Sequence, residues 1–288
     1  MRSRGLRSGV QQLTHWDWSS VLPLVAAMFA AGSISGVIAG MLGVGGGIIL
    51  VPVLEWALAV AGVPSELSIK IAVATSLATI IPTGIASSRA HARRDAIDRQ
   101  VVRAWAAPLV VGAVVGTLLA ARLNGTTLRI VFATVAGLVA LKMLLPLDHV
   151  TLRRDLPLGW RAAWLPFLIG SISTLMGIGG GSLSVPAMTL CNQPMHRAVG
   201  TASLLGLWIA VPATLGFLAA DVSQLSMPSF NVGYVNYLGF ALIAPATWLA
   251  APLGAHLAHR MSRRHLGLTF GAFLMLVALR MLWRSIAH

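Results

Sequence analysis

A glycine-rich stretch that occurs twice constrains this chain more than any other feature. The first copy, residues 43–47, reads GVGGG and is followed by Pro52, whereas the second, residues 177–181, reads GIGGG and is followed by Pro186. Four glycines within five residues are expected to interrupt a helix, because glycine adopts backbone conformations that other residues avoid. Both copies lie in apolar sequence, and a helix break in a membrane must face protein or a water-filled cavity. The alternative explanation of one cluster is close helix packing through small residues. The duplication and the matching prolines favour two helix breaks.

The composition indicates an all-α polytopic membrane protein. Of the 288 residues, 57% are hydrophobic and 10% are charged, and the mean hydropathy is +0.81. A membrane-spanning β-barrel is excluded, because its strands alternate apolar and polar residues over about ten positions, whereas the apolar runs here are about twice as long. A single cysteine, Cys191, excludes an internal disulfide.

Eight apolar segments are each long enough to cross a bilayer, which requires about 20 residues. The first and the fifth contain the glycine motifs and are therefore expected to be broken. The segments are Val21 to Leu58, Ile69 to Ser88, Val101 to Ala121, Leu128 to Leu147, Trp164 to Leu190, Ala198 to Ala220, Val235 to Ala258 and Leu266 to Trp283.

The chain is a tandem duplication. The glycine motifs lie 134 positions apart (177 minus 43), and residues 139–144, VALKML, recur as VALRML at residues 277–282. Five identities in six make a chance match implausible, and repeated units indicate a repeated architecture. We divide the chain into an N-terminal basic segment (1–20), a first transmembrane repeat (21–147), a connecting loop (148–163) and a second transmembrane repeat (164–288).

Loop charges predict that the two repeats are inverted relative to each other. The loop 89–103 is rich in arginine and is therefore expected in the cytoplasm, whereas its counterpart 220–236 has no Lys or Arg. The next loop, 259–265, is basic again. Inversion requires each glycine-motif segment to make an even number of crossings, for example as a re-entrant pair of half-helices. Three arginines in the segment 1–20 oppose this orientation. The net charge of +13 is explained by topology, so we expect no nucleic-acid partner.

The duplicated motif resembles the TauE/SafE family of sulfite exporters and related anion permeases. The resemblance rests on the GxGGG stretches, the Val-Pro that follows them and the Ala-Thr-Ser-Leu element at residues 74–77, and it covers roughly residues 36–283. It implies a secondary transporter for sulfite, organosulfonates or similar small anions, without a cofactor. The family's signature falls on Gly43, Gly45, Gly46, Gly47, Pro52, Thr75, Ser76, Gly177, Gly179, Gly180, Gly181, Pro186, Thr201 and Ser203. The second copy departs from the pattern by placing Ala202 between the two hydroxyl residues.

The signature residues suggest an anion site at the middle of the membrane. A helix that restarts after each glycine cluster would direct free N–H groups and the positive end of its dipole at the site. Paired interrupted segments in matching halves are typical of secondary transporters that work by alternating access. The four hydroxyls could donate hydrogen bonds to an oxyanion, or they could bond only to nearby backbone carbonyls.

Two residues are candidates for proton coupling. Glu55 lies three residues after Pro52, and His256 lies in the span before the second basic loop. Lys142 and Arg280 occupy equivalent places near the ends of their spans and are explained by snorkelling to the interface.

Other functional classes find little support in the sequence. No His-Glu-x-x-His, Gly-x-Ser-x-Gly or buried carboxylate pair indicates an enzyme, and no metal site is expected. An anion channel and an assembly factor without transport remain as alternatives. We expect an integral protein of a bacterial inner membrane whose partners are the lipid bilayer and a small anionic substrate. The apolar run from Val21 continues into the glycine motif, so we expect an uncleaved first span.

Overall fold

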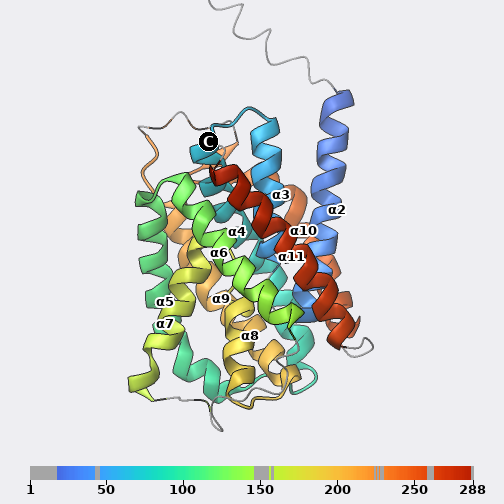
Figure 1. The fold of residues 1–288 in the computed structure, drawn as a ribbon, viewed down its shortest axis with the longest axis vertical. Coiled ribbons are helices and arrows are strands. Elements are labelled where there is room, and N and C mark those ends of the chain that lie inside the picture. The colour runs from blue at the N-terminus through green and yellow to red at the C-terminus, as the bar shows by residue number, and fades with distance from the viewer. Residues whose placement is uncertain are drawn as a thin grey trace, which may run out of the picture.

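The computed structural model describes residues 18–42, 46–145, 156, 159–223, 225, 227, 230–257 and 263–286. Within these residues the chain is almost entirely helical, and the two interrupted segments convert eight apolar segments into ten α-helices (Figure 1). A short antiparallel ribbon of β1 (Asn231–Val232) and β2 (Val235–Asn236) precedes α10. The helices are α2 (Trp18–Leu42), α3 (Gly47–Val60), α4 (Ser65–Ala92), α5 (Arg99–Arg122), α6 (Gly125–Leu144), η1 (Trp160–Ala162), α7 (Trp164–Leu175), α8 (Gly181–Leu190), α9 (Met195–Leu218), α10 (Tyr237–Leu257) and α11 (Arg263–Ile286).

The helices that follow the breaks are too short to cross a membrane. Helices α4, α5, α6, α9 and α10 have the length and apolar composition of full spans. By contrast, α3 has 14 residues and α8 has 10. At 1.5 Å per residue they extend about 21 and 15 Å, short of the roughly 30 Å hydrocarbon core. Each glycine motif therefore produces a half-length helix that begins inside the protein.

The two halves run in opposite directions, as the loop charges predict. In Figure 1, α2 descends and α3 returns upward, whereas α7 ascends and α8 returns downward. Helix α4 then descends and α9 ascends. Each glycine-motif segment is thus a re-entrant hairpin. The basic loop between α4 and α5 lies at the lower end, which the positive-inside rule assigns to the cytoplasm. The arginines of the segment 1–17 lie outside the described residues.

Each re-entrant hairpin packs against the opposite half of the chain. Helix α2 contacts α10, and α7 contacts α5, while α4 and α9 cross at the centre. Small residues allow these close approaches: a Cβ at Gly40 would collide with the carbonyl oxygen of Ala251, and a Cβ at Gly112 would collide with that of Phe167. Packing through small residues, considered above for the glycine motifs, therefore also holds α2 and α5 to their neighbours.

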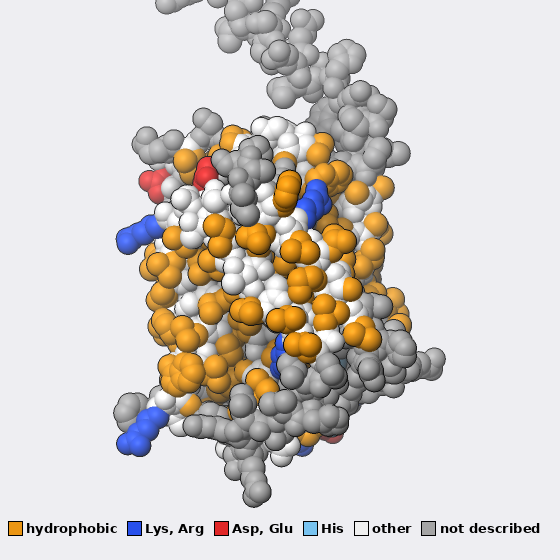
Figure 2. Space-filling model, in the orientation of Figure 1, with side chains coloured by type: hydrophobic (Ala, Val, Ile, Leu, Met, Phe, Trp, Pro, Cys, Tyr) orange, Lys and Arg blue, Asp and Glu red, His pale blue; other side chains and the backbone are white. Residues whose placement is uncertain are grey.

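The surface matches a protein embedded in lipid. Figure 2 shows a broad band of hydrophobic side chains, with charged side chains toward the upper and lower ends. Leu138, Leu249 and Leu276 are more than 60% exposed. Tryptophans such as Trp164 and Trp283 are exposed near helix ends, where amphipathic rings favour the membrane interface. The molecule is an integral membrane protein.

Candidate substrate site

The two glycine motifs form equivalent helix starts. Gly46 caps α3 with φ of 72°, and Gly180 caps α8 with φ of 73°. These left-handed conformations favour glycine, because other residues meet steric conflict there. The first helical hydrogen bonds return to the carbonyls of these caps: Ile49 and Leu50 donate to Gly46, and Leu183 and Ser184 donate to Gly180. The N–H groups of the first two residues of each half-helix consequently have no acceptor within the helix.

The helix breaks meet at the centre of the molecule. Gly47 lies against the second break, where a Cβ would collide with the Gly177 carbonyl oxygen and lie 3.0 Å from the Ile178 Cα. Ser76 donates to the same Gly177 carbonyl over 2.9 Å. The N-terminus of α3, and with it the positive end of the helix dipole, therefore faces the second glycine motif. Gly43 and Gly45 lie outside the described residues.

A serine supports the first break and has a counterpart in the second. Ser35 donates to the Gly46 carbonyl over 2.8 Å, and Ser173 lies beside Gly180. Residues 29–35, FAAGSIS, match residues 167–173, FLIGSIS, at five of seven positions. Our sequence reasoning missed this pair, although the repeated Gly-Ser-Ile-Ser could have revealed it.

The prolines of the motif lie inside the half-helices. Pro52 occupies the sixth position of α3, and Pro186 occupies the sixth position of α8. Proline has no N–H group, so the carbonyls four residues earlier, at Ile48 and Ser182, receive no helical hydrogen bond from these positions. Each motif therefore leaves helical hydrogen bonds unmade at the first N–H groups of its half-helix and at the carbonyl four residues before its proline.

The two motif threonines make the same contact in opposite halves. Thr75 Oγ1 accepts from the backbone N–H of Asn236, and Thr201 Oγ1 accepts from that of Asp98, both over 2.9 Å. Both threonines are fully buried. Each hydroxyl thus ties one central helix to the residue that precedes α10 or α5.

The structure also shows how residues 201–203 of the second half align with Thr75 and Ser76 of the first half. Because Thr75 and Thr201 are equivalent, Ala202 occupies the position of Ser76, and Ser203 lies one position further. Ser203 donates to the Gly200 carbonyl of its own helix over 2.7 Å. Of the two equivalent helices, α4 and α9, only α4 provides a hydroxyl, that of Ser76, which donates to the Gly177 carbonyl among the described residues.

The second break is more polar than the first. Ser182 and Ser184 follow its glycines, where the first break has Ile48 and Leu50. All four side chains are buried, and the two serine Oγ atoms have no hydrogen-bond partner among the described residues. A buried hydroxyl without a partner costs about 1–3 kcal/mol, so these groups are suited to a polar ligand.

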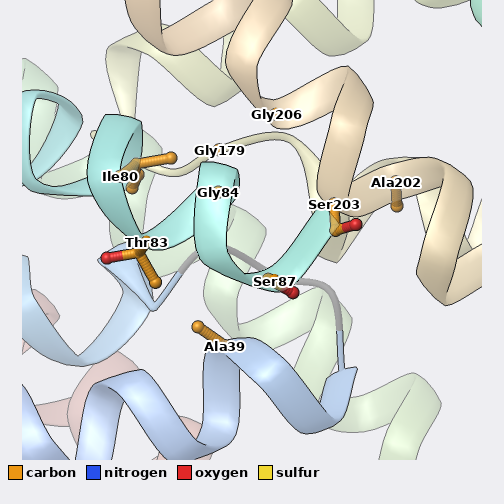
Figure 3. Close-up of a pocket in the computed structure, with 9 residues that line it drawn as sticks. All are labelled: Ala39, Ile80, Thr83, Gly84, Ser87, Gly179, Ala202, Ser203 and Gly206. Carbon is orange, nitrogen blue, oxygen red and sulfur yellow. The ribbon is translucent and has the colours of Figure 1, made fainter. Parts of the chain in front are cut away.

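A small cavity lies beside the second break (Figure 3). Its volume is about 10 Å³, close to the space of one water molecule. Seven of its nine lining residues were not predicted, although hydroxyls at positions 79, 83 and 87 form a polar stripe at helical spacing. The lining consists of Ala39 of α2, Ile80, Thr83, Gly84 and Ser87 of α4, Gly179 of the break, and Ala202, Ser203 and Gly206 of α9.

Glu55 forms a buried ion pair outside this cavity. Its Oε1 lies 2.5 Å from Arg129 Nε, and Arg129 also donates to Ser65 Oγ over 2.7 Å. Both charged side chains are buried. The pair fastens α3 to α6 and to the start of α4. Arg129 was not among the predicted residues, although it is a charged residue within an apolar segment.

His256 lies at the lower end of α10. Arg94 Nη2 lies 3.1 Å from His256 Nδ1, and Arg94 Nη1 donates to the Ala255 carbonyl over 3.3 Å. This contact joins the basic loop after α4 to the end of α10. Neither candidate for proton coupling lines the cavity.

Comparison with known proteins agrees with this architecture. Residues 13–281 match the family model described as sulfite exporter TauE/SafE. A probable membrane transporter protein of Haemophilus influenzae is 30% identical over 87% of this chain and 95% of its own length. The probable membrane transporter protein YunE of Bacillus subtilis is 25% identical over 88% of this chain and 96% of its own length. The probable membrane transporter protein MJ0441 of Methanocaldococcus jannaschii is 24% identical over 91% and 96%, respectively. No solved structure matches the chain significantly.

Proposed function

This chain belongs to the sulfite exporter TauE/SafE family and is a membrane transporter, and we propose that it carries small sulfur-containing anions such as sulfite or organosulfonates by alternating access. The observation that carries this proposal is the contact between the start of α3 at Gly47 and the second glycine motif at Gly177 and Ile178. Each half-helix start presents a positive dipole end and N–H groups that have no acceptor within its own helix, which favour an anion. The arrangement needs no cofactor.

The proposed site is built from the two motifs and the helices that follow them. Main-chain N–H groups supply the attraction, and the partnerless hydroxyls of Ser182 and Ser184 add donors at the second break. We assign substrate binding to Gly43, Gly45, Gly46, Gly47, Pro52, Thr75, Ser76, Gly177, Gly179, Gly180, Gly181, Pro186, Thr201 and Ser203. Within this set the threonines and Ser76 act by holding the backbone in place.

Alternating access is supported by the different packing of the two sides. The cavity is lined by Ala39 near the end of α2 and by Thr83, Gly84 and Ser87 toward the end of α4, and both helices end at the lower side in Figure 1. Toward the upper side, Phe217 and Tyr234 are buried and meet edge to face, with ring centroids 6.2 Å apart. Burial also raises the pKa of the Tyr234 phenol. We infer from this packing that the upper side is the closed side in this conformation.

Transport without a coupling ion is the simplest mechanism that fits the charges. Glu55 is held in an ion pair by Arg129, and His256 contacts Arg94 at the lower end of α10. An interior-negative potential favours the exit of an anion by about 2.3 kcal/mol per charge per 100 mV. Export can thus proceed on the membrane potential.

The test is flux into liposomes that contain only this protein. We expect saturable uptake of sulfite or a sulfonate and stimulation of labelled uptake by unlabelled anion inside, which is the behaviour of a carrier. Flux that does not saturate and shows no such exchange would identify a channel. Absence of flux for sulfite, thiosulfate, sulfonate and sulfate would support an assembly factor and refute the proposal.

A further inference from the structure

Ser87 is the one cavity-lining hydroxyl whose hydrogen-bonding capacity is unused among the described residues. It is 2% exposed, and its Oγ has no hydrogen-bond partner in that part of the chain. Figure 3 shows it on α4, between Ala39 of α2 and Ser203 of α9. A serine in a helix ordinarily bonds a carbonyl of the preceding turn. Thr83 and Thr79, one and two turns earlier on α4, do so, but Ser87 does not.

The other two hydroxyls that line the cavity each donate a hydrogen bond within their own helix. Thr83 Oγ1 donates to the Thr79 carbonyl, and Ser203 Oγ donates to the Gly200 carbonyl, each over 2.7 Å. A hydroxyl has a single O–H to donate. Ser87 is consequently the side chain that can donate a hydrogen bond to a molecule in the cavity.

The cavity carries no compensating positive charge. None of its nine lining residues is charged. The cost of moving an ion out of water into a medium of low polarity grows with the square of its charge, and buried charges need a partner of opposite sign. One hydroxyl and a neutral backbone can therefore offset the burial cost of an anion with one negative charge far better than that of an anion with two negative charges.

We propose that Ser87 binds the substrate through its hydroxyl and that the cavity beside Gly179 selects singly charged oxyanions. This inference rests on the proposed anion transport and adds to it a residue and a substrate class. The cavity of about 10 Å³ is smaller than any such anion, so α4 and α9 separate at this point when the substrate enters. Ser87 lies five residues before the end of α4, which is the lower, cytoplasmic end of this helix in Figure 1, and it receives the anion from that side.

The experiment compares Ser87→Ala with Ser88→Ala in the same liposomes. Ser88 is the adjacent residue, and its Oγ donates to the Ile85 carbonyl of its own helix over 3.3 Å. The probes are methanesulfonate, which carries one charge, and sulfate, which carries two. We expect the wild-type protein to transport methanesulfonate in preference to sulfate. Ser87→Ala should raise KM for methanesulfonate about ten-fold, the effect of one hydrogen bond to a charged group, while Ser88→Ala leaves KM unchanged.

A labelling measurement keeps the proposal falsifiable if flux of Ser87→Ala falls for reasons of folding. In a Cys191→Ser background, Ser87→Cys should react with a thiol reagent from the cytoplasmic side, and methanesulfonate should slow the reaction. Absence of flux by the wild-type protein for these two anions and also for sulfite and thiosulfate would refute the proposed function and this inference with it, whereas transport of sulfite without transport of methanesulfonate would overturn this inference alone. Normal flux with an unchanged KM in Ser87→Ala, no protection of Ser87→Cys, or a preference for sulfate would overturn this inference alone.

Discussion

Breaking the Glu55–Arg129 ion pair from one side should destabilise the protein strongly. Arg129→Met preserves much of the side-chain volume and leaves the Glu55 carboxylate buried without its partner, since both residues are about 3% exposed. Removing one member of a buried pair typically costs about 3–5 kcal/mol. The same substitution also removes the hydrogen bond to Ser65 Oγ. We therefore expect the free energy of unfolding to fall by about 3–5 kcal/mol.

The double variant Glu55→Leu/Arg129→Met distinguishes the loss of the whole ion pair from the burial of one charge without its partner. Replacing both partners by apolar residues of similar size is often neutral or stabilising, so the double variant should recover most of the lost stability. The measurement is unfolding by SDS in mixed micelles, with anion flux measured in parallel. Wild-type stability in Arg129→Met would refute our reasoning that the pair is desolvated. Flux in the double variant would show that transport does not require the Glu55 carboxylate.

Three further predictions follow from the site. Gly46→Leu and Gly180→Leu should abolish flux with the protein still inserted, because a side chain would strain the left-handed cap and cover the N–H groups; unchanged flux in either would count against a backbone-built site. Thr75→Val and Thr201→Val should each lower the free energy of unfolding by about 1–3 kcal/mol, since a buried N–H loses its acceptor; equal stability of both with wild type would contradict this role. A potassium diffusion potential at matched pH should drive anion efflux, and Glu55→Gln should retain it; efflux that follows only a pH gradient and disappears in Glu55→Gln would establish proton coupling.

The sequence predicted the architecture well, because membranes restrict the possibilities. Apolar runs of spanning length, two glycine interruptions and the difference in loop charge suffice to predict eight apolar segments, two of them broken, in two opposed halves. The same physical rule applies at every position: backbone polar groups in lipid must be bonded within the segment. The half-helices α3 and α8 follow directly from glycines at the positions where φ is positive.

The sequence predicted the site only in part, because a hydroxyl does not reveal its partner. Thr75 and Thr201 stay predicted donors to the substrate, and the structure adds that their oxygens accept from backbone N–H groups 161 and 103 residues away in the sequence. Such long-range contacts leave no periodic signal. Ser87 was not predicted, because its interest comes from a buried hydroxyl that has no hydrogen-bond partner among the described residues. Only the packing of α2, α4 and α9 around the cavity reveals this.

The ion pair between Glu55 and Arg129 also makes the two halves mechanically unequal. At the position of Glu55, 134 residues later, α8 carries Thr189, whose hydroxyl donates to the Pro186 carbonyl of its own helix. The ion pair thus holds α3 to α6, whereas the described residues of α8 form no ion pair with another helix. Hydrogen exchange should therefore be faster in α8 than in α3. We therefore expect the second copy of the motif to move more than the first when the transporter changes conformation.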